Sequence, residues 1–270
     1  MFRKRYFLSF FLVFVIAFCA SACKSSSEFG SKEMVSLLVP FYIYPTTINP
    51  QTGNFYWSDL AKSSSNITKI SAIINPNNGD HGKYCDENFK KGVRQLKASG
   101  ISVLGYTYTK YAHRDQALIE KSVDFYKDKY HVDAFFLDEA NSSQRAMLYY
   151  EELRAYINKD ASDSEIVLNY GVKPDEKVIK NDKMKSVVFE GEYKTFISDK
   201  NRIVSKLSQK NSVCFVYNIA REKMKDTIDL AIAKGCAQLY LTDDSGENPW
   251  DTLPGYWNAM LSYINKFNRL

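Results

Sequence analysis

The stretch FFLDE, Phe135–Glu139, is an apolar run that ends abruptly in two adjacent carboxylates. A second run of the same design, Val187–Glu190, follows about fifty residues later. In parallel β/α proteins the strand bodies are buried and read as continuous apolar runs, and the functional residues lie at the carboxyl ends of the strands. The two runs therefore predict a parallel sheet that carries acids at one edge.

Outward from these runs, apolar, β-branched or aromatic segments recur along the whole chain, and most are separated by helical patterns. This alternation is expected of consecutive βα units. The predicted strands are Ser36–Tyr44, Lys69–Asn75, Ser102–Thr107, Ala134–Asp138, Ile166–Asn169, Ser186–Glu190, Ser212–Asn218 and Ala237–Thr242.

The segments between the strands place apolar residues at helical spacing. Gly100 and Gly235 follow two of them, as expected of glycines that end a helix. Eight βα units in about 250 residues match a single (β/α)8 TIM-type barrel, which we predict for residues 35–270. A doubly wound sheet is the alternative, which periodicity alone does not exclude. The predicted helices are Glu87–Ser99, Ser143–Asn158, Arg221–Lys234 and Tyr256–Phe267, with a short one around 174–180.

Residues 1–22 have the pattern of a signal peptide. Basic residues at 3–5, an apolar stretch at 7–18 and Ala-Ser-Ala at 20–22 precede Cys23. Ala-Ser-Ala-Cys at 20–23 resembles a bacterial lipobox. Cys23 is therefore the predicted lipidation site, and residues 23–34 are the predicted tether. Ordinary signal cleavage before Cys23 is the alternative. We expect an exported protein held on the cell envelope by a lipid anchor. The outer membrane is favoured because Lys24 stands where inner-membrane retention signals often carry Asp.

Three of the five cysteines remain once Cys19 and Cys23 are set aside, so at most one internal disulfide can form. Cys214 lies in one predicted strand and Cys236 directly precedes the next, so the two can approach each other. The sequence leaves the bond open, and buried free thiols are the expectation.

Charge and motifs exclude several classes of function. The formal net charge of +5 falls to +2 without the basic residues at 3–5, and no basic block suggests nucleic acid as a partner. His81, His113 and His131 lack metal-ligand spacing, and no nucleophile elbow, Walker A motif or dinucleotide fingerprint is present. We expect no metal or organic cofactor, and a monomer.

The carboxyl ends of the predicted strands are rich in carboxylates, amides and tyrosines. In a barrel these ends meet in one crater, where acids supply chemistry, amides and phenols bind hydroxyl groups, and rings stack on sugar faces. The predicted catalytic residues are Asp138, Glu139 and Glu190. The predicted substrate-binding residues are Tyr42, Asn75, Tyr106, Tyr108, Asn169, Tyr217 and Asp243.

Structural roles are the alternative for several of these residues. Asp138 is also a suitable helix N-cap, Glu190 an ordinary exposed acid, and Asp243 part of a turn. Adjacent side chains of a strand point to opposite sides, so at most one of Asp138 and Glu139 can face the barrel axis directly.

Seven short segments between residues 36 and 265, each weak alone, are specific in combination. They are Leu38–Pro45, Ile74–Gly79, Gly105–Thr109 with Tyr111 and Arg114, Phe136–Glu139, Tyr149–Tyr150, Leu168–Asn169 with Gly171, and Phe189–Glu190. In this order they resemble the spherulation-specific, or spherulin-4-like, family of glycoside hydrolases.

The resemblance implies a (β/α)8 enzyme that cleaves internal α-1,4 bonds in microbial exopolysaccharide rich in N-acetylgalactosamine, the matrix of some biofilms. It matches the family's acids to Asp138, Glu139 and Glu190. Two departures are expected to line the cleft and so bear on the substrate. Gly-Asp-His-Gly at 79–82 stands where Gly-Pro-Gly is usual, and Tyr170 replaces a proline.

We expect Asp138 to act as nucleophile or charge stabiliser, Glu190 as general acid, and Glu139 to orient or tune one of them. The distance between the two principal acids decides whether the anomeric configuration is retained or inverted. The alternative function, from another class, is a non-catalytic glycan-binding surface lipoprotein on the same fold. A scaffold of the cell envelope explains none of the strand-end pattern.

Overall fold

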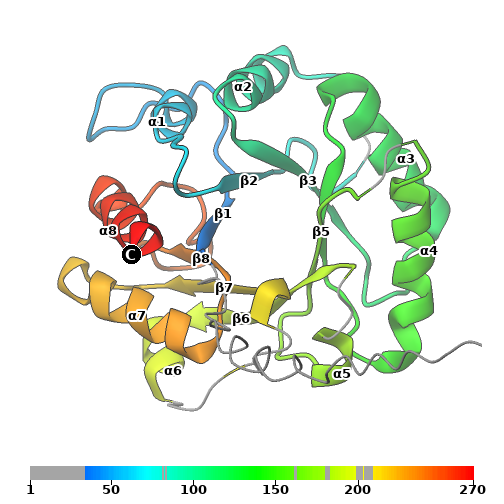
Figure 1. The fold of residues 1–270 in the computed structure, drawn as a ribbon. Coiled ribbons are helices and arrows are strands. Elements are labelled where there is room, and N and C mark those ends of the chain that lie inside the picture. The colour runs from blue at the N-terminus through cyan, green and yellow to red at the C-terminus, as the bar shows by residue number, and fades with distance from the viewer. Residues whose placement is uncertain are drawn as a thin grey trace, which may run out of the picture. The chain divides into compact units, whose positions relative to one another are not determined.

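Eight parallel strands close into a barrel in the computed structural model, which describes residues 34–80, 82, 84–160, 163–179, 183–198, 203 and 209–270 (Figure 1). The ring closes where β8 pairs with β1, through Ser36 with Gln238 and Leu37 with Leu239. The predicted single (β/α)8 barrel is confirmed. Barrel order equals chain order: β1 (Ser36–Pro40), β2 (Ile70–Ile74), β3 (Ser102–Tyr108), β4 (Ala134–Asp138), β5 (Ile166–Asn169), β6 (Lys185–Glu192), β7 (Ser212–Tyr217) and β8 (Gln238–Leu241).

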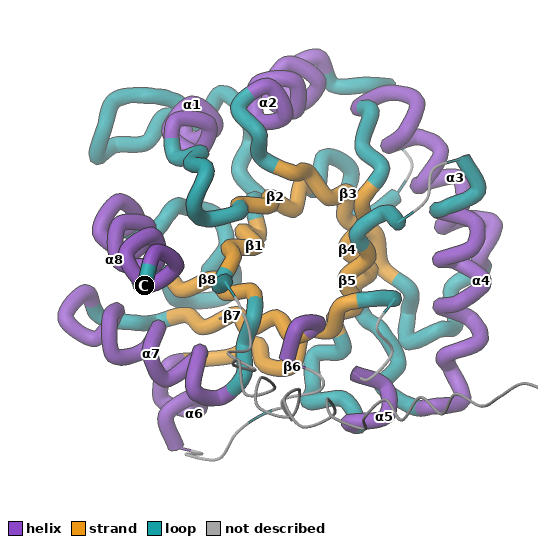
Figure 2. The backbone as a smooth tube through the Cα atoms, in the orientation of Figure 1, coloured by secondary structure: helices purple, strands orange, loops and turns teal. Residues whose placement is uncertain are grey.

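Helices surround the ring of strands, as Figure 2 shows. Asp86 and Asp115 accept hydrogen bonds from backbone N–H groups in the first turns of α2 and α3, which explains where these two helices begin. In the described part of the chain no helix is both long and apolar enough to cross a bilayer. The α-helices are α1 (Tyr56–Lys62), α2 (Glu87–Ala98), α3 (Gln116–Phe125), α4 (Met147–Ile157), α5 (Glu176–Ile179), α6 (Tyr193–Ser198), α7 (Met224–Lys234) and α8 (Trp257–Arg269).

Short helical turns of other types extend several of these helices. The π-helical turn η1 (Tyr126–Tyr130) continues α3, and the 3-10 turns η2 (Gln144–Ala146) and η4 (Arg221–Lys223) precede α4 and α7. A further 3-10 turn, η3 (Gln209–Asn211), leads into β7. The helices predicted to begin at Ser143 and Arg221 therefore open with 3-10 turns.

Residues 33–270 form one compact unit. The predicted signal peptide at 1–22 lies outside the described residues, as does the predicted tether at 23–34 with Cys23, apart from Met34. These assignments stay predictions.

Two strands end earlier than their apolar patterns suggest. β1 stops at Pro40, and the N–H of Phe41 makes a last ladder bond to the carbonyl of Ile73 at 2.8 Å before the chain leaves the sheet. β7 stops at Tyr217 because Asn218 takes a left-handed conformation with φ 59°. Aromatic residues beyond the tip of β1 thus belong to a loop.

Left-handed backbone recurs where loops leave the strands. After β2 it occurs at Asn78 and Gly79, after β3 at the three residues 110–112, after β4 at Glu139 and after β7 at Asn218. A non-glycine residue in this region costs about 1–2 kcal/mol, so its surroundings must hold it there. The backbone around Glu139 is held by hydrogen bonds from the N–H of Tyr111 and the hydroxyl of Thr109 to the Glu139 carbonyl.

Aromatic rings fill the barrel near the carboxyl ends of the strands. Phe136 stacks on Tyr106 with ring centroids 6.1 Å apart and lies 6.2 Å from Phe215. On the outer side of β3, Gly105 leaves room for the ring of Tyr126, since a Cβ there would lie 2.8 Å from that ring. β3 is therefore packed on its inner side against Phe136 and on its outer side against Tyr126 of η1.

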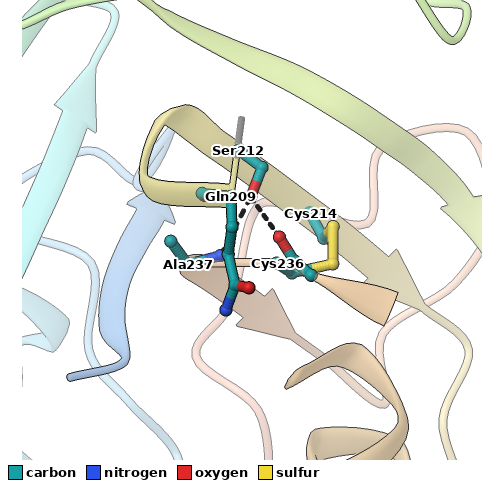
Figure 3. Close-up of a disulfide and its surroundings, with 6 residues drawn as sticks. Gln209, Ser212, Cys214, Cys236 and Ala237 are labelled. Atoms are coloured by element: carbon teal, nitrogen blue, oxygen red, sulfur yellow. Dashed lines mark hydrogen bonds between the residues drawn. A yellow bond between two sulfur atoms is a disulfide. The ribbon is translucent and has the colours of Figure 1, made fainter. Parts of the chain in front are cut away.

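Cys214 and Cys236 form a disulfide, contrary to the expected buried thiols (Figure 3). Cys214 lies near the start of β7, and Cys236 two residues before β8, with Cα atoms 5.8 Å apart. Around the bond, Ser212 donates to the carbonyls of Gln209 and Gly235. The sequence could not decide the pairing because it depends on the register between β7 and β8. Cys85 is a free thiol.

Candidate active site

A cavity of about 150 Å³ opens at the carboxyl ends of the strands. It brings together six of the predicted site residues, from loops and strand ends far apart in the chain. Its lining residues are Pro40, Tyr42, Asn75, Tyr106, Phe136, Asp138, Asn169, Glu190, Phe215 and Trp250.

One amide nitrogen joins the two principal acids. Asn169 Nδ2 donates to Asp138 Oδ1 at 2.9 Å and to Glu190 Oε2 at 2.8 Å. These two carboxylate oxygens can therefore be no more than about 5.7 Å apart, the sum of the two distances. The predicted convergence of the tips of β4 and β6 on one pocket is thus realised through the tip of β5.

The orientation of the Asn169 carboxamide follows from its neighbours. The N–H of Gly171 donates to Asn169 Oδ1 at 3.3 Å, which leaves the NH2 group to face the two carboxylates. A reversed amide would set its oxygen against two carboxylate oxygens. Asn169 is 6% exposed, so this arrangement is enclosed by protein.

The environment of Glu190 favours its protonated form. Glu190 is an exposed residue, but its Oε2 accepts a hydrogen bond from the buried side chain of Asn169. Desolvation there raises the pKa of Glu190, the charge of Asp138 raises it further, and the hydrogen bond from Asn169 opposes the rise. Glu190 is thus suited to be the proton-holding acid of the pair.

Both oxygens of Asp138 accept hydrogen bonds. Tyr106 donates its hydroxyl to Asp138 Oδ2 at 2.8 Å, and Asn169 serves Oδ1. Burial, followed by the nearby charge of Asp138, raises the pKa of Tyr106 and of Tyr42, so both phenols keep their protons.

Glu139 is not part of this pair. Its left-handed backbone, φ 49°, ends β4, and Glu139 is not among the residues that line the cavity. Its charge still contributes to the raised pKa of Tyr106, so it lies near that phenol. The expectation that only one of the adjacent acids faces the axis agrees with this placement.

Three predicted substrate-binding residues lie outside the cavity lining. The ring of Tyr108 lies under the guanidinium of Arg114, 4.0 Å from its Cζ. Tyr217 packs edge-on against Trp250, with centroids 5.7 Å apart. Asp243 accepts a hydrogen bond from the N–H of Gly255 at 2.9 Å, twelve residues further along the chain.

Three apolar residues of the lining were not predicted. Pro40, Phe136 and Phe215 precede the polar residues Tyr42, Asp138 and Tyr217 by two positions, so the alternation along a strand was an available signal for them. Trp250 comes from the loop after β8, and it contacts Phe215, Tyr217 and Tyr240. No periodicity places a loop residue of this kind.

The described residues of the two departures from the family pattern also lie outside the lining, contrary to expectation. Tyr170 is 2% exposed and buried on the other side of β5 from Asn169. Gly79 packs behind Tyr106 and Tyr108, and a Cβ there would lie 2.9 Å and 2.8 Å from their rings. His81 is outside the described residues.

Two larger hollows lie elsewhere on the described surface. One of about 530 Å³ lies beside the amino end of β5, and one of about 580 Å³ lies between α1 and α8. Neither contains a strand-tip acid, so the smaller cavity is the candidate active site. In the described part of the chain no group of three His, Cys, Asp or Glu residues is arranged to hold a metal ion.

Comparison of sequences finds one family and one characterised relative. A profile of the spherulation-specific family 4 matches residues 36–264. Spherulin-4 of Physarum polycephalum is 32% identical over 147 residues, which span 54% of this chain and 42% of Spherulin-4. The match thus covers less than half the length of that relative.

Comparison of structures finds the same barrel in Sph3 of Aspergillus clavatus, solved in complex with GalNAc. The TM-score is 0.74 at 18% sequence identity, and the alignment covers 87% of this chain and 99% of Sph3. At that identity the similarity shows a shared fold.

Proposed function

This chain belongs to the spherulation-specific family 4, and on that basis we propose that it is a glycoside hydrolase whose acids are Asp138 and Glu190. The observation that carries the proposal is the Asn169 amide between the two carboxylates in the lining of the strand-end cavity. Glycoside hydrolysis requires one acid that holds a proton and one that is ionised. The raised pKa of Glu190 suits it to hold the proton, and Asp138, which accepts hydrogen bonds from Tyr106 and Asn169, is the proposed ionised partner.

The proposed reaction is a double displacement with retention. The bound on the separation of the two carboxylate oxygens falls near the roughly 5–5.5 Å of retaining enzymes, and below the roughly 6.5–9.5 Å that leaves room for a water in inverting ones. Asp138 attacks the anomeric carbon while Glu190 gives its proton to the departing glycosidic oxygen. Glu190 then takes a proton from water, the water oxygen bonds to the anomeric carbon, and Asp138 is released.

The proposed substrate is an exopolysaccharide with α-1,4-linked galactosamine or N-acetylgalactosamine, cleaved internally. Family membership and the GalNAc bound to the structurally similar Sph3 support this choice. A cavity of about 150 Å³ is smaller than the roughly 300–1,000 Å³ usual for drug-sized ligands, which suits a single sugar ring. The remaining units of a polymer would lie across the exposed rim.

We also propose that the protein acts outside the cytoplasm, as a monomer, tethered through a lipid at Cys23. The buried disulfide supports export, because such bonds persist in oxidising compartments. Labelling cells with a radioactive fatty acid tests the anchor, and Cys23→Ala should remove the label. A cytoplasmic, unlabelled parent protein would refute the proposal of an anchor.

The test of function is product release from a partly N-acetylated α-1,4-linked galactosamine polymer. The parent should release oligosaccharides, and Asp138→Asn and Glu190→Gln should each reduce the rate by about 10²–10⁴-fold. A matched control is Asp229→Asn, which removes a carboxylate on α7 that accepts from Tyr263 at the surface.

Two other outcomes count against this function. Tight binding of the polymer by all variants with no release would favour the glycan-binding lipoprotein. Release by the parent that persists in both acid variants would move the catalytic residues elsewhere.

A further inference from the structure

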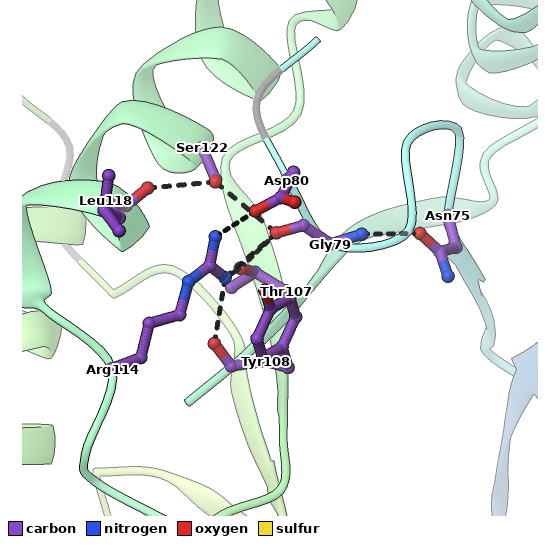
Figure 4. Close-up of polar contacts among 8 residues, drawn as sticks. All are labelled: Asn75, Gly79, Asp80, Thr107, Tyr108, Arg114, Leu118 and Ser122. Carbon is purple, nitrogen blue, oxygen red and sulfur yellow. Dashed lines mark hydrogen bonds and ion pairs between the residues drawn. The ribbon is translucent and has the colours of Figure 1, made fainter. Parts of the chain in front are cut away.

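Arg114 is a buried cation close to the candidate active site but not in it. Its side chain is 4% exposed, and it lies in the loop between β3 and α3. Burying a guanidinium costs free energy unless hydrogen-bond acceptors surround it. The acceptors around Arg114 therefore identify the segments that it holds in place. Figure 4 shows those contacts.

The guanidinium binds the turn that follows β2. Arg114 Nη1 donates to the carbonyl of Gly79 at 3.1 Å, the hydroxyl of Thr107 at 3.0 Å and the carbonyl of Tyr108 at 3.0 Å. Nη2 pairs with the carboxylate of Asp80. We call Arg114 with Gly79, Asp80, Thr107 and Tyr108 the Arg114 clamp.

The carbonyl of Gly79 is the centre of the clamp. Besides Arg114 it accepts from the hydroxyl of Thr107 at 2.8 Å and from that of Ser122 at 3.5 Å (Figure 4). Gly79 needs its φ of 77°, and it lies flat against Tyr106 and Tyr108, where any Cβ would collide with the rings. Two kinds of contact therefore fix the turn at Gly79. Arg114 binds its carbonyl group, and the rings of Tyr106 and Tyr108 pack against its Cα.

The other polar group of Gly79 faces the cavity. Its N–H donates to Asn75 Oδ1 at 2.9 Å, and Asn75 is one of the residues that line the cavity. With Oδ1 engaged, the NH2 group of Asn75 is the part left for a ligand, and within the described residues it has no hydrogen-bond partner. Asn75 thus presents a donor to the cavity, which selects a ligand oxygen opposite it, such as a hydroxyl or an acetamido carbonyl.

We propose that Arg114 is a positioning residue that acts through the Gly79 turn to present the NH2 group of Asn75 to the ligand. The inference rests on the proposed function for its consequence in catalysis, whereas the clamp itself can be tested without any activity. Asn75 would touch the ligand, and Arg114 would not.

The first arm measures hydrogen exchange of the Gly79 amide by NMR in the parent and in Arg114→Lys. Lysine keeps the charge but cannot make the forked contacts, so exchange should accelerate about tenfold or more. Arg154→Lys is the matched control, since Arg154 pairs with Glu151 on α4, away from the cavity. Thr107→Val, which removes one support of the same carbonyl, should give a smaller acceleration and serves if Arg114→Lys does not fold.

The second arm is a double-mutant cycle on polymer hydrolysis with Arg114→Lys and Asn75→Ala. Each single variant should raise KM about tenfold, and the double variant should be no worse than Asn75→Ala alone. A merely structural role for Arg114 would lower activity equally in both backgrounds.

The outcomes separate this inference from the proposed function. Unchanged Gly79 exchange in Arg114→Lys overturns the clamp, and faster exchange with additive effects on KM overturns its action through Asn75. A parent that releases no product refutes the hydrolase, and the affinity for a galactosamine oligosaccharide then replaces KM in the cycle. If that parent also binds no oligosaccharide, action through Asn75 is overturned as well.

Discussion

Asp138 and Glu190 lie on either side of a single amide nitrogen, each with one carboxylate oxygen within 2.9 Å of it. The shared donor brings together two carboxylates that come from different strands. The surroundings of the two acids differ. Asp138 has a second hydrogen-bond donor in Tyr106, whereas desolvation raises the pKa of Glu190.

The first expectation concerns stereochemistry. Because the bridged oxygens of the two acids are no more than about 5.7 Å apart, near the separation typical of retaining enzymes, the initial product should keep the anomeric configuration of the substrate. Proton NMR of a freshly started reaction, read before the product mutarotates, decides this. An initial product of opposite configuration would require a wider separation of the acids than the structure has.

The second expectation concerns pH. Glu190 must carry a proton to act as general acid, so activity should be present below its raised pKa and fall as the pH rises through it. The hydrogen bond from Asn169 lowers that pKa, so Asn169→Ala should move the alkaline limb of the kcat/KM profile to higher pH. The whole profile of the variant should also be lower. Tyr106→Phe, which acts on Asp138, is the control that should leave this limb in place; movement of the limb to lower pH in Asn169→Ala would contradict the assignment of Glu190.

The third expectation concerns the second donor to Asp138. Tyr106→Phe removes a hydrogen bond to a carboxylate, a contact worth about 1.5–3 kcal/mol, so kcat/KM should fall about 10- to 100-fold. Tyr263→Phe is matched to it, because Tyr263 makes the same kind of bond to Asp229 on the surface between α8 and α7. Steady-state kinetics of both variants measure the difference. Equal activities would mean that Tyr106 does not serve the reaction.

The fourth expectation concerns the disulfide. It closes a loop of 22 residues at the amino end of β7 and β8, so replacing both Cys214 and Cys236 by Ala should cost about 3 kcal/mol. For a chain of this size the melting temperature should fall by about 6–12 °C. Activity at 25 °C should persist because the bond lies at the opposite end of the barrel from the cavity. Cys85→Ala is the control, and a disulfide-free variant with the parent's melting temperature would show that the bond does not stabilise the fold.

The fold was predictable because each buried strand is a recognisable apolar run in the sequence. β2 and β5 are buried at every position, and continuous apolar runs of this kind, separated by amphipathic helices, leave few architectures. The ends of the strands were less predictable. Apolar residues run on past Pro40 into the loop after β1, and the left-handed turn at Asn218 has no signal stronger than the residue type.

The site was predictable where a side chain sits at a strand end. Asn75, Asp138, Asn169 and Glu190 were identified because parallel strands bring their carboxyl ends together. What the sequence could not supply is how these residues are divided between roles. Asn169 reads as a ligand-binding amide, yet in the structure both of its N–H groups are spent on the two acids.

Loop residues set the other limit. Tyr108 and Asp243 follow strands just as Tyr106 does, but the first supports Arg114 and the second caps a turn at Gly255. Their orientation depends on contacts between loops that are distant in sequence. Only the folded chain contains that information.

The left-handed residues at the strand ends bear on how this protein can evolve or be engineered. Positions 78, 110–112, 139 and 218 exclude β-branched side chains on backbone grounds alone, whatever chemistry a new substrate would favour. Random libraries placed in these loops would lose most members before selection for activity begins. Trp250 lines the cavity from a loop on ordinary backbone, so a library at this position is free of that restriction.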